Sequence, residues 1–175
     1  NGIKIVEIDE PDLNLFDCLS ANINDAVPVI VVNKNFNTER KRFTLLHELG
    51  HLLLNIPDAF SEKDEEKLCN RFAGAMLLPK EIVYTEIGEN RSKISLNELI
   101  NYQKQFGISI QALIYRLGDL GIISDYRKNQ FFILRNSKPE FKKRVDKERF
   151  LGSETSERFK RLVYKALSVE IISIS

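Results

Sequence analysis

The stretch FTLLHELGHLLLN occupies residues 43–55 and decides how the chain folds. On a helical projection one face carries both histidines, together with Phe43, Gly50 and Leu54. Another face carries only leucines, namely Leu45, Leu49, Leu52 and Leu53. A helix that is apolar nearly all round lies in the interior of a protein. We therefore predict a central helix, which Asn37 or Thr38 can cap and which must end before Pro57.

Within this helix, His47 and His51 enclose a glutamate, Glu48. Residues four apart on a helix lie one above the other, so both imidazoles can reach one metal ion. Glu48 lies about 100° around the helix from His47, in reach of a water on the metal and not of the metal itself. Both histidines of the chain fall in this H-E-x-x-H pattern, which is typical of zinc peptidases. We interpret Glu48 as the catalytic base.

A catalytic zinc site needs a third protein ligand and one open position. The chain has no third histidine, so this ligand must be an aspartate, glutamate or cysteine. A second helix, capped by Ser61 and ending near residues 78–79, carries Glu66 on a stripe flanked by apolar positions. We assign Glu66 as the third ligand, with Glu65 and then Cys69 as alternatives. One turn on, Asn70 can accept a hydrogen bond from a ligand imidazole.

Residues 1–34, ahead of the metal helix, have a β pattern. The segments Ile3–Ile8, Phe16–Ile23 and Pro28–Val32 are short and apolar, and turn-forming residues separate them. Short links favour a small, three-stranded, mainly antiparallel sheet packed on the metal helix. Helical patterns dominate the rest of the chain, so the predicted fold class is α+β.

The chain has 175 residues, of which 43% are hydrophobic, enough to bury a core. No apolar run approaches the roughly 18 residues of a membrane-spanning helix, and no signal peptide opens the chain. Two cysteines, Cys18 and Cys69, make no disulfide framework, so we expect reduced thiols and a cytoplasmic protein. The start at Asn1 without a methionine and the apolar end at Ser175 predict a piece of a longer protein.

Two segments around the metal motif resemble the ImmA/IrrE family of zinc metallopeptidases. They are RFTLLHELGHLLL at residues 42–54 and EKLCNRFAGAMLLP at residues 66–79. The resemblance is close over residues 28–80 and departs at Cys69, where alanine is more usual. It implies a gluzincin-like site with His47, His51 and Glu66 as ligands, Glu48 as base and Asn70 supporting a ligand. It also implies that the substrate is a helix-turn-helix repressor.

Two later segments also resemble that family. FGISIQALIYRLGDLGII, at residues 106–123, is similar to its helix-turn-helix-like region, and ERFKRLVYKAL, at residues 157–167, to the tail of longer members. Such longer members often carry a DNA-binding domain before the peptidase. Helices are expected at residues 96–105, 110–120, 123–135 and 156–169, and a loop or linker at 136–155. The predicted domains are a zincin-like metallopeptidase core at 1–90, a helix-turn-helix-like region at 91–135, and a basic linker with a truncated C-terminal helix at 136–175.

The reaction also needs a donor to the oxyanion, and no histidine remains for it. Tyr84 is our candidate, with Tyr102 and Tyr115 as alternatives. The main competing hypothesis is a DNA-binding or scaffold regulator with a residual metal site, and a zinc hydrolase other than a peptidase is another. Against DNA binding, the second helix of the pair exposes a thin basic surface: Gln111, Tyr115, Arg116 and Asp119.

Charge is distributed unevenly along the chain. Residues 126–165 contain 13 Lys and Arg against 5 Asp and Glu, and the remainder contains 13 against 20. A solvated helical face can have this composition, but so can a surface for an acidic partner or DNA. We predict that the stretch Arg127–Lys165 makes such a contact and that affinity for the natural partner falls as salt rises. An affinity that stays constant from low to high salt would exclude the electrostatic role.

Overall fold

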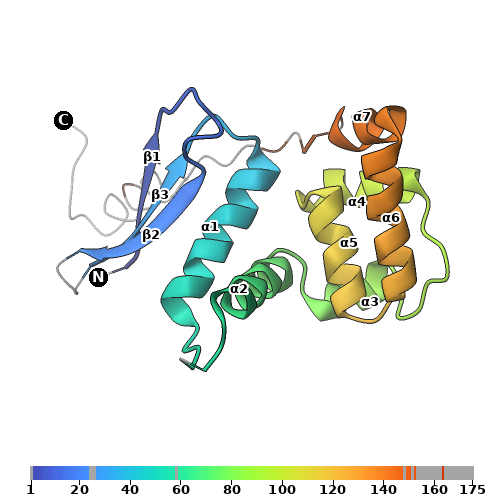
Figure 1. The fold of residues 1–175 in the computed structure, drawn as a ribbon, viewed down its shortest axis with the longest axis horizontal. Helices are drawn as coiled ribbons and strands as arrows, with labels where there is room; N and C mark the ends of the chain where they lie inside the picture. Colours follow the sequence, from blue (N-terminus) through green and yellow to red (C-terminus); the bar gives the residue numbers. More distant parts are fainter. Residues whose placement is uncertain are drawn as a thin grey trace.

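The computed structural model describes residues 2–23, 27–57, 59–147, 149, 150, 152 and 163. In this part of the chain three strands precede seven helices (Figure 1). The elements are β1 (Lys4–Ile8), β2 (Cys18–Ile23), β3 (Val27–Asn33), α1 (Thr38–Leu53), α2 (Glu62–Leu77), α3 (Lys80–Glu86), α4 (Leu96–Phe106), α5 (Ile110–Asp119), α6 (Asp125–Ser137) and α7 (Pro139–Lys147). None of the described helices is long and apolar enough to cross a membrane.

The three strands form one sheet in the order β1-β3-β2. The α+β class is confirmed, but the sheet is mixed: β2 runs antiparallel to β3, whereas β1 runs parallel to it. The central strand is β3, the most apolar of the three, in which Ile30 and Val32 are 2% and 1% exposed. The chain between β1 and β2 therefore has to cross the end of β3. The buried side chain of Asn33 holds this crossover by donating to the carbonyl oxygens of Glu10 and Phe16.

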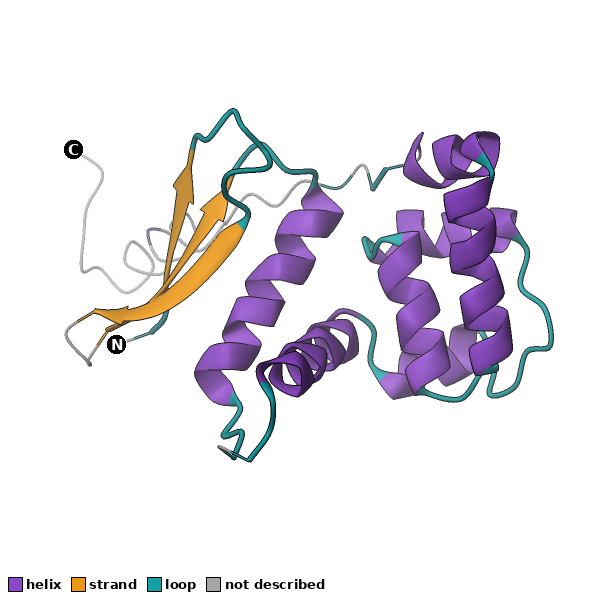
Figure 2. Ribbon diagram, viewed as in Figure 1, coloured by secondary structure: helices purple, strands orange, loops and turns teal. Residues whose placement is uncertain are grey.

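Helix α1 packs against β2 and β3 on one side and against α2 on the other. Figure 2 shows this order, with the sheet, then α1 and α2, and then the remaining helices on the far side. Asn37 caps α1 by accepting a 2.9 Å hydrogen bond from the backbone N–H of Arg40. The helix ends at Leu53, before Pro57 as expected. The predicted central helix is confirmed.

Gly50 of α1 lies in close contact with Cys69 of α2. A Cβ atom added to Gly50 would lie 3.2 Å from Cys69 Cα and 3.3 Å from both Cβ and Sγ of Cys69. Cys69 is fully buried at this contact. Two small residues therefore set the distance between α1 and α2.

The helical half has a core of its own, formed by α3 to α7 around the pair α4 and α5. Ser95 and Glu98 make a capping box at the start of α4, and Gly107 ends that helix with a left-handed φ of 64°. This positive φ is the reason the turn between α4 and α5 requires glycine. Helices α4 and α5 match the predicted ranges 96–105 and 110–120 to within one residue at each end.

Two helices were not expected. Helix α3 follows Pro79 directly, and α7 lies inside the segment 136–155 that we predicted to be a loop. The loop prediction was wrong because two apolar residues at helical spacing, Phe141 and Val145, anchor an otherwise charged helix. Val145 is 2% exposed, and Arg135 of α6 pairs with Asp146 at 2.9 Å. The helix predicted at 156–169 lies outside the described residues, apart from residue 163.

We predict opposite changes in the free energy of unfolding when Gly50 and Gly74 are each replaced by alanine. Gly50→Ala gains helix propensity but overpacks a buried contact, so we expect a net loss of about 1–2 kcal/mol in the free energy of unfolding. Gly74 of α2 is the control, because its added Cβ would meet only Arg116 Cδ at an ordinary 3.8 Å. Gly74→Ala should be neutral or stabilising by up to about 1 kcal/mol. Urea denaturation of metal-free protein measures both, and a Gly50→Ala variant as stable as Gly74→Ala would contradict the contact.

Candidate metal centre

Three side chains from α1 and α2 converge on one point. His47 Nε2 lies 3.1 Å from His51 Nε2, and the two oxygens of Glu66 lie 3.3 Å and 3.2 Å from these nitrogens. One potential ligand atom from each of the three residues lies within 4.8 Å of the others. Two imidazoles and a carboxylate are a ligand set that zinc accepts. The predicted residues His47, His51 and Glu66 are therefore brought together.

Each imidazole is oriented through its other nitrogen. Asn70 Oδ1 lies 3.0 Å from His47 Nδ1, and Glu65 Oε1 lies 2.9 Å from His51 Nδ1. An oxygen acceptor at Nδ1 favours the tautomer that carries hydrogen there and leaves the Nε2 lone pair free. The predicted position of Asn70 agrees with this geometry. Glu65, which we weighed as an alternative ligand, instead contacts the far side of His51.

This arrangement fits a cation on electrostatic grounds. With hydrogen on both Nδ1 atoms, the converging Nε2 lone pairs and the Glu66 carboxylate are all acceptors, and they face one another across little more than 3 Å. Acceptors without a donor between them repel, and a divalent cation removes that repulsion. The donor set and its supporting contacts therefore match a metal ion such as Zn²⁺.

Glu48 is not one of the three converging side chains. Its Oε2 accepts a 2.6 Å hydrogen bond from the hydroxyl of Ser20 on β2. Ser20 is thus the partner of one of the two carboxylate oxygens of Glu48. Ser20 was missed by sequence reasoning, although Cys18 and Ser20 alternate on one face of β2, and that spacing could have placed both toward α1. Burial raises the pKa of the Cys18 thiol to about 12, and the Glu48 carboxylate adds to this shift.

The geometry favours Glu66 over Cys69 as the third ligand. Cys69 is buried against Gly50, and Glu66 reaches both imidazoles. Burial raises the pKa of the Cys69 thiol to about 11, with smaller contributions from Glu65, Glu66 and Glu48.

The three candidate tyrosines lie in the helical half. Tyr84 of α3 packs against the helical core, and the Lys80 ammonium lies over its ring. Tyr102 donates to the carbonyl oxygen of Glu86, and Tyr115 packs against Phe132 with ring centroids 4.8 Å apart. The structure does not bring these hydroxyls into the converging cluster. The assignment of Tyr84 as the oxyanion donor stays a prediction.

The sequence of this chain is similar to those of known metallopeptidases. A family described as the IrrE N-terminal-like domain, a peptidase family, matches residues 2–118. Radiation response metalloprotease IrrE of Deinococcus radiodurans is 40% identical over 67 residues, which cover 31% of this chain and 20% of that protein. The protein of the same name from Deinococcus deserti is 39% identical over 67 residues, covering 31% and 24%. The matched stretch is thus at most about a quarter of these relatives. The chain belongs to the IrrE N-terminal-like family of metallopeptidases.

Proposed function

We propose that this chain is a zinc-dependent endopeptidase that hydrolyses a peptide bond in a protein partner. The observation that carries the proposal is the convergence of His47, His51 and Glu66, with Glu48 held beside them. The proposed partner is a helix-turn-helix transcriptional repressor, and that choice rests on the family resemblance of the metal-motif segments. Cytoplasmic localisation is part of the same proposal.

In the proposed reaction the chain's own groups hold the ion and move protons. A zinc ion held by His47, His51 and Glu66 would polarise the scissile carbonyl and acidify the attacking water. Asn70 and Glu65 keep the two imidazoles oriented. Glu48 takes the proton of the attacking water on Oε1, because Ser20 occupies Oε2, and passes it to the leaving amine.

The competing hypothesis is a DNA-binding or scaffold regulator, and α5 is the helix that would read DNA if the helix-turn-helix-like pair bound it. Two polar side chains of α5 instead contact other parts of the chain. Arg116 donates to the carbonyl oxygen of Leu78, and Gln111 lies against Arg135 and Asp146. These contacts favour a role in which the helical pair supports the peptidase core.

The ligand assignment predicts a graded loss of zinc affinity. Glu66→Ala removes a proposed ligand and should greatly weaken zinc retention. Asn70→Ala removes the acceptor at His47 Nδ1 and should weaken affinity by about 10–100-fold. Glu62→Ala, in the exposed first turn of α2, is the control and should bind as the unmodified chain does. Elemental analysis and competition with a chelator measure all three variants, and unchanged affinity in Glu66→Ala would transfer the role to Glu65 or Cys69.

Glu48→Gln separates the proposed base from the ligands. The amide keeps the size of the side chain and can still accept from Ser20, so fold and zinc content should be preserved. Turnover should fall by about 10²–10⁴-fold, the range for a lost general base. His47→Ala should instead lose both zinc and activity. The assay uses a repressor encoded beside this chain as substrate, and cleavage by Glu48→Gln at the unmodified rate would refute the mechanism.

If the unmodified, zinc-loaded chain cleaves no partner yet binds DNA tightly, the regulator hypothesis replaces the peptidase. Measuring cleavage and DNA binding on the same preparation distinguishes the two functions. Measuring the zinc content of that preparation shows whether a failure to cleave is caused by loss of zinc from the protein.

A further inference from the structure

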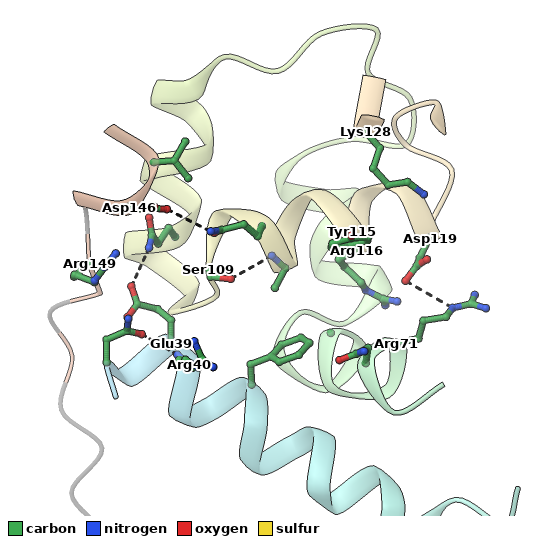
Figure 3. Close-up of a pocket in the computed structure, with 18 of the residues that line it drawn as sticks. Glu39, Arg40, Arg71, Ser109, Tyr115, Arg116, Asp119, Lys128, Asp146 and Arg149 are labelled. Atoms are coloured by element: carbon green, nitrogen blue, oxygen red, sulfur yellow. Dashed lines mark hydrogen bonds and ion pairs between the residues drawn. The ribbon is translucent and has the colours of Figure 1, made fainter. Parts of the chain in front are cut away.

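A cavity of about 870 Å³ lies between the metal helices and the helical half (Figure 3). Its walls come from α1 and α2 on one side and from α5, α6 and α7 on the other. Cavities of this size commonly bind small molecules. Asn70 lines the cavity, but none of the three converging side chains does. The cavity is therefore a neighbour of the candidate metal centre and not a part of it.

Several cations line this cavity, and three of them are already neutralised. Their partners are carboxylates outside the lining: Asp17 for Arg40, Asp64 for Lys67 and Asp125 for Lys128, at 2.6–2.8 Å. These three side chains add to the positive potential of the cavity, but each is already in an ion pair with a carboxylate.

Arg71 and Arg116 differ from these three. Arg71 Nε lies 3.7 Å from Asp119 Oδ2, too far for a hydrogen bond. Arg116 donates its Nε to the carbonyl oxygen of Leu78, which fixes its guanidinium without neutralising it. Figure 3 shows both arginines and Asp119 on the same side of the cavity. Asp119 thus lies near both guanidinium groups without a hydrogen bond to Arg71, and Glu81 is a further carboxylate that acts on Arg116.

The electrostatics of Arg116 agree with a shortage of negative charge. Burial lowers the pKa of its guanidinium, and Arg71 adds to this shift; Asp119, Glu81 and Tyr84 oppose it, yet the pKa stays below its ordinary value. An arginine stays protonated in proteins, so such a group is stabilised by any further anion within reach. Arginine pairs of this kind bind the oxygens of phosphate and carboxylate groups through parallel N–H donors.

We propose that Arg71 and Arg116 form an anion-binding site in this cavity for a small molecule that carries a phosphate or carboxylate group. The rings of Phe43 and Tyr115 also line the cavity, so an organic ligand has apolar surface to contact. A bound anion bridges α2, which carries Arg71, and α5, which carries Arg116. The site does not depend on the proposed peptidase reaction, because its residues are neither ligands nor base there.

Inorganic phosphate and citrate are the probes that test this site. Titration calorimetry on the full chain, kept metal-free with a chelator, measures binding away from the metal centre. We expect saturable binding of at least one probe, and the tighter of the two identifies phosphate or carboxylate as the preferred head group. No saturable binding of either probe up to about 10 mM, a very weak dissociation constant, would overturn the proposal.

Three variants give the site a distinct signature. Arg71→Gln should weaken binding by about tenfold or more, since a charge-assisted hydrogen bond is lost; its side chain is 60% exposed, so folding should survive. Asp119→Asn should tighten binding by about threefold to tenfold, because a competing negative charge is removed. Lys63→Gln, elsewhere on α2, is the control and should change nothing. Equal weakening by Arg71→Gln and Lys63→Gln, or weaker binding by Asp119→Asn, would overturn the proposal.

Discussion

The contact between Gly50 and Cys69 is the constraint on which the candidate metal centre depends. Gly50 precedes His51 in α1, and Cys69 lies three residues after Glu66 in α2, so the approach of these two helices fixes the separation of the three converging side chains. A Cβ atom at Gly50 would press on Cys69, on the helix that also carries Glu66. The small residues at the crossing are thus as important to the site as the residues that would bind the metal.

That close packing forces together groups that would otherwise separate. Two imidazole nitrogens and a carboxylate face one another, and both far nitrogens are fixed by oxygen acceptors on α2. Without a cation such a cluster opposes the folding that creates it, so binding of a metal adds to stability as well as to function. Glu48 is not in this cluster; its carboxylate accepts a hydrogen bond from the hydroxyl of Ser20 in the sheet. One helix thereby carries the two converging imidazoles and a carboxylate with a different partner.

The spacing of His47 and His51 predicted their convergence, because four residues on a helix fix the geometry without any tertiary information. The stripe on α2 likewise predicted Glu66. Glu65 and Ser20 could not be assigned in the same way, because their contacts depend on how α2 and β2 meet α1. The three-stranded sheet was predicted, but the parallel pairing of β1 with β3 was not, because the order of strands depends on tertiary packing and cannot be read from the length of the links.

The helical half is not independent of the metal helix. Arg42 of α1 donates a 2.9 Å hydrogen bond to the carbonyl oxygen of Phe106 at the end of α4. One turn earlier, the buried carboxylate of Glu39 accepts hydrogen bonds from Gln103 of α4 and from the backbone N–H of Phe150. Both donors reach Oε1, whereas Oε2 is buried without a hydrogen-bond partner among the described residues, so the cost of burying this carboxylate is compensated on one oxygen only. Because α1 supplies both contacts, a displacement of α4 would act on the helix that carries His47 and His51. The domain boundary at residue 90 stays a prediction.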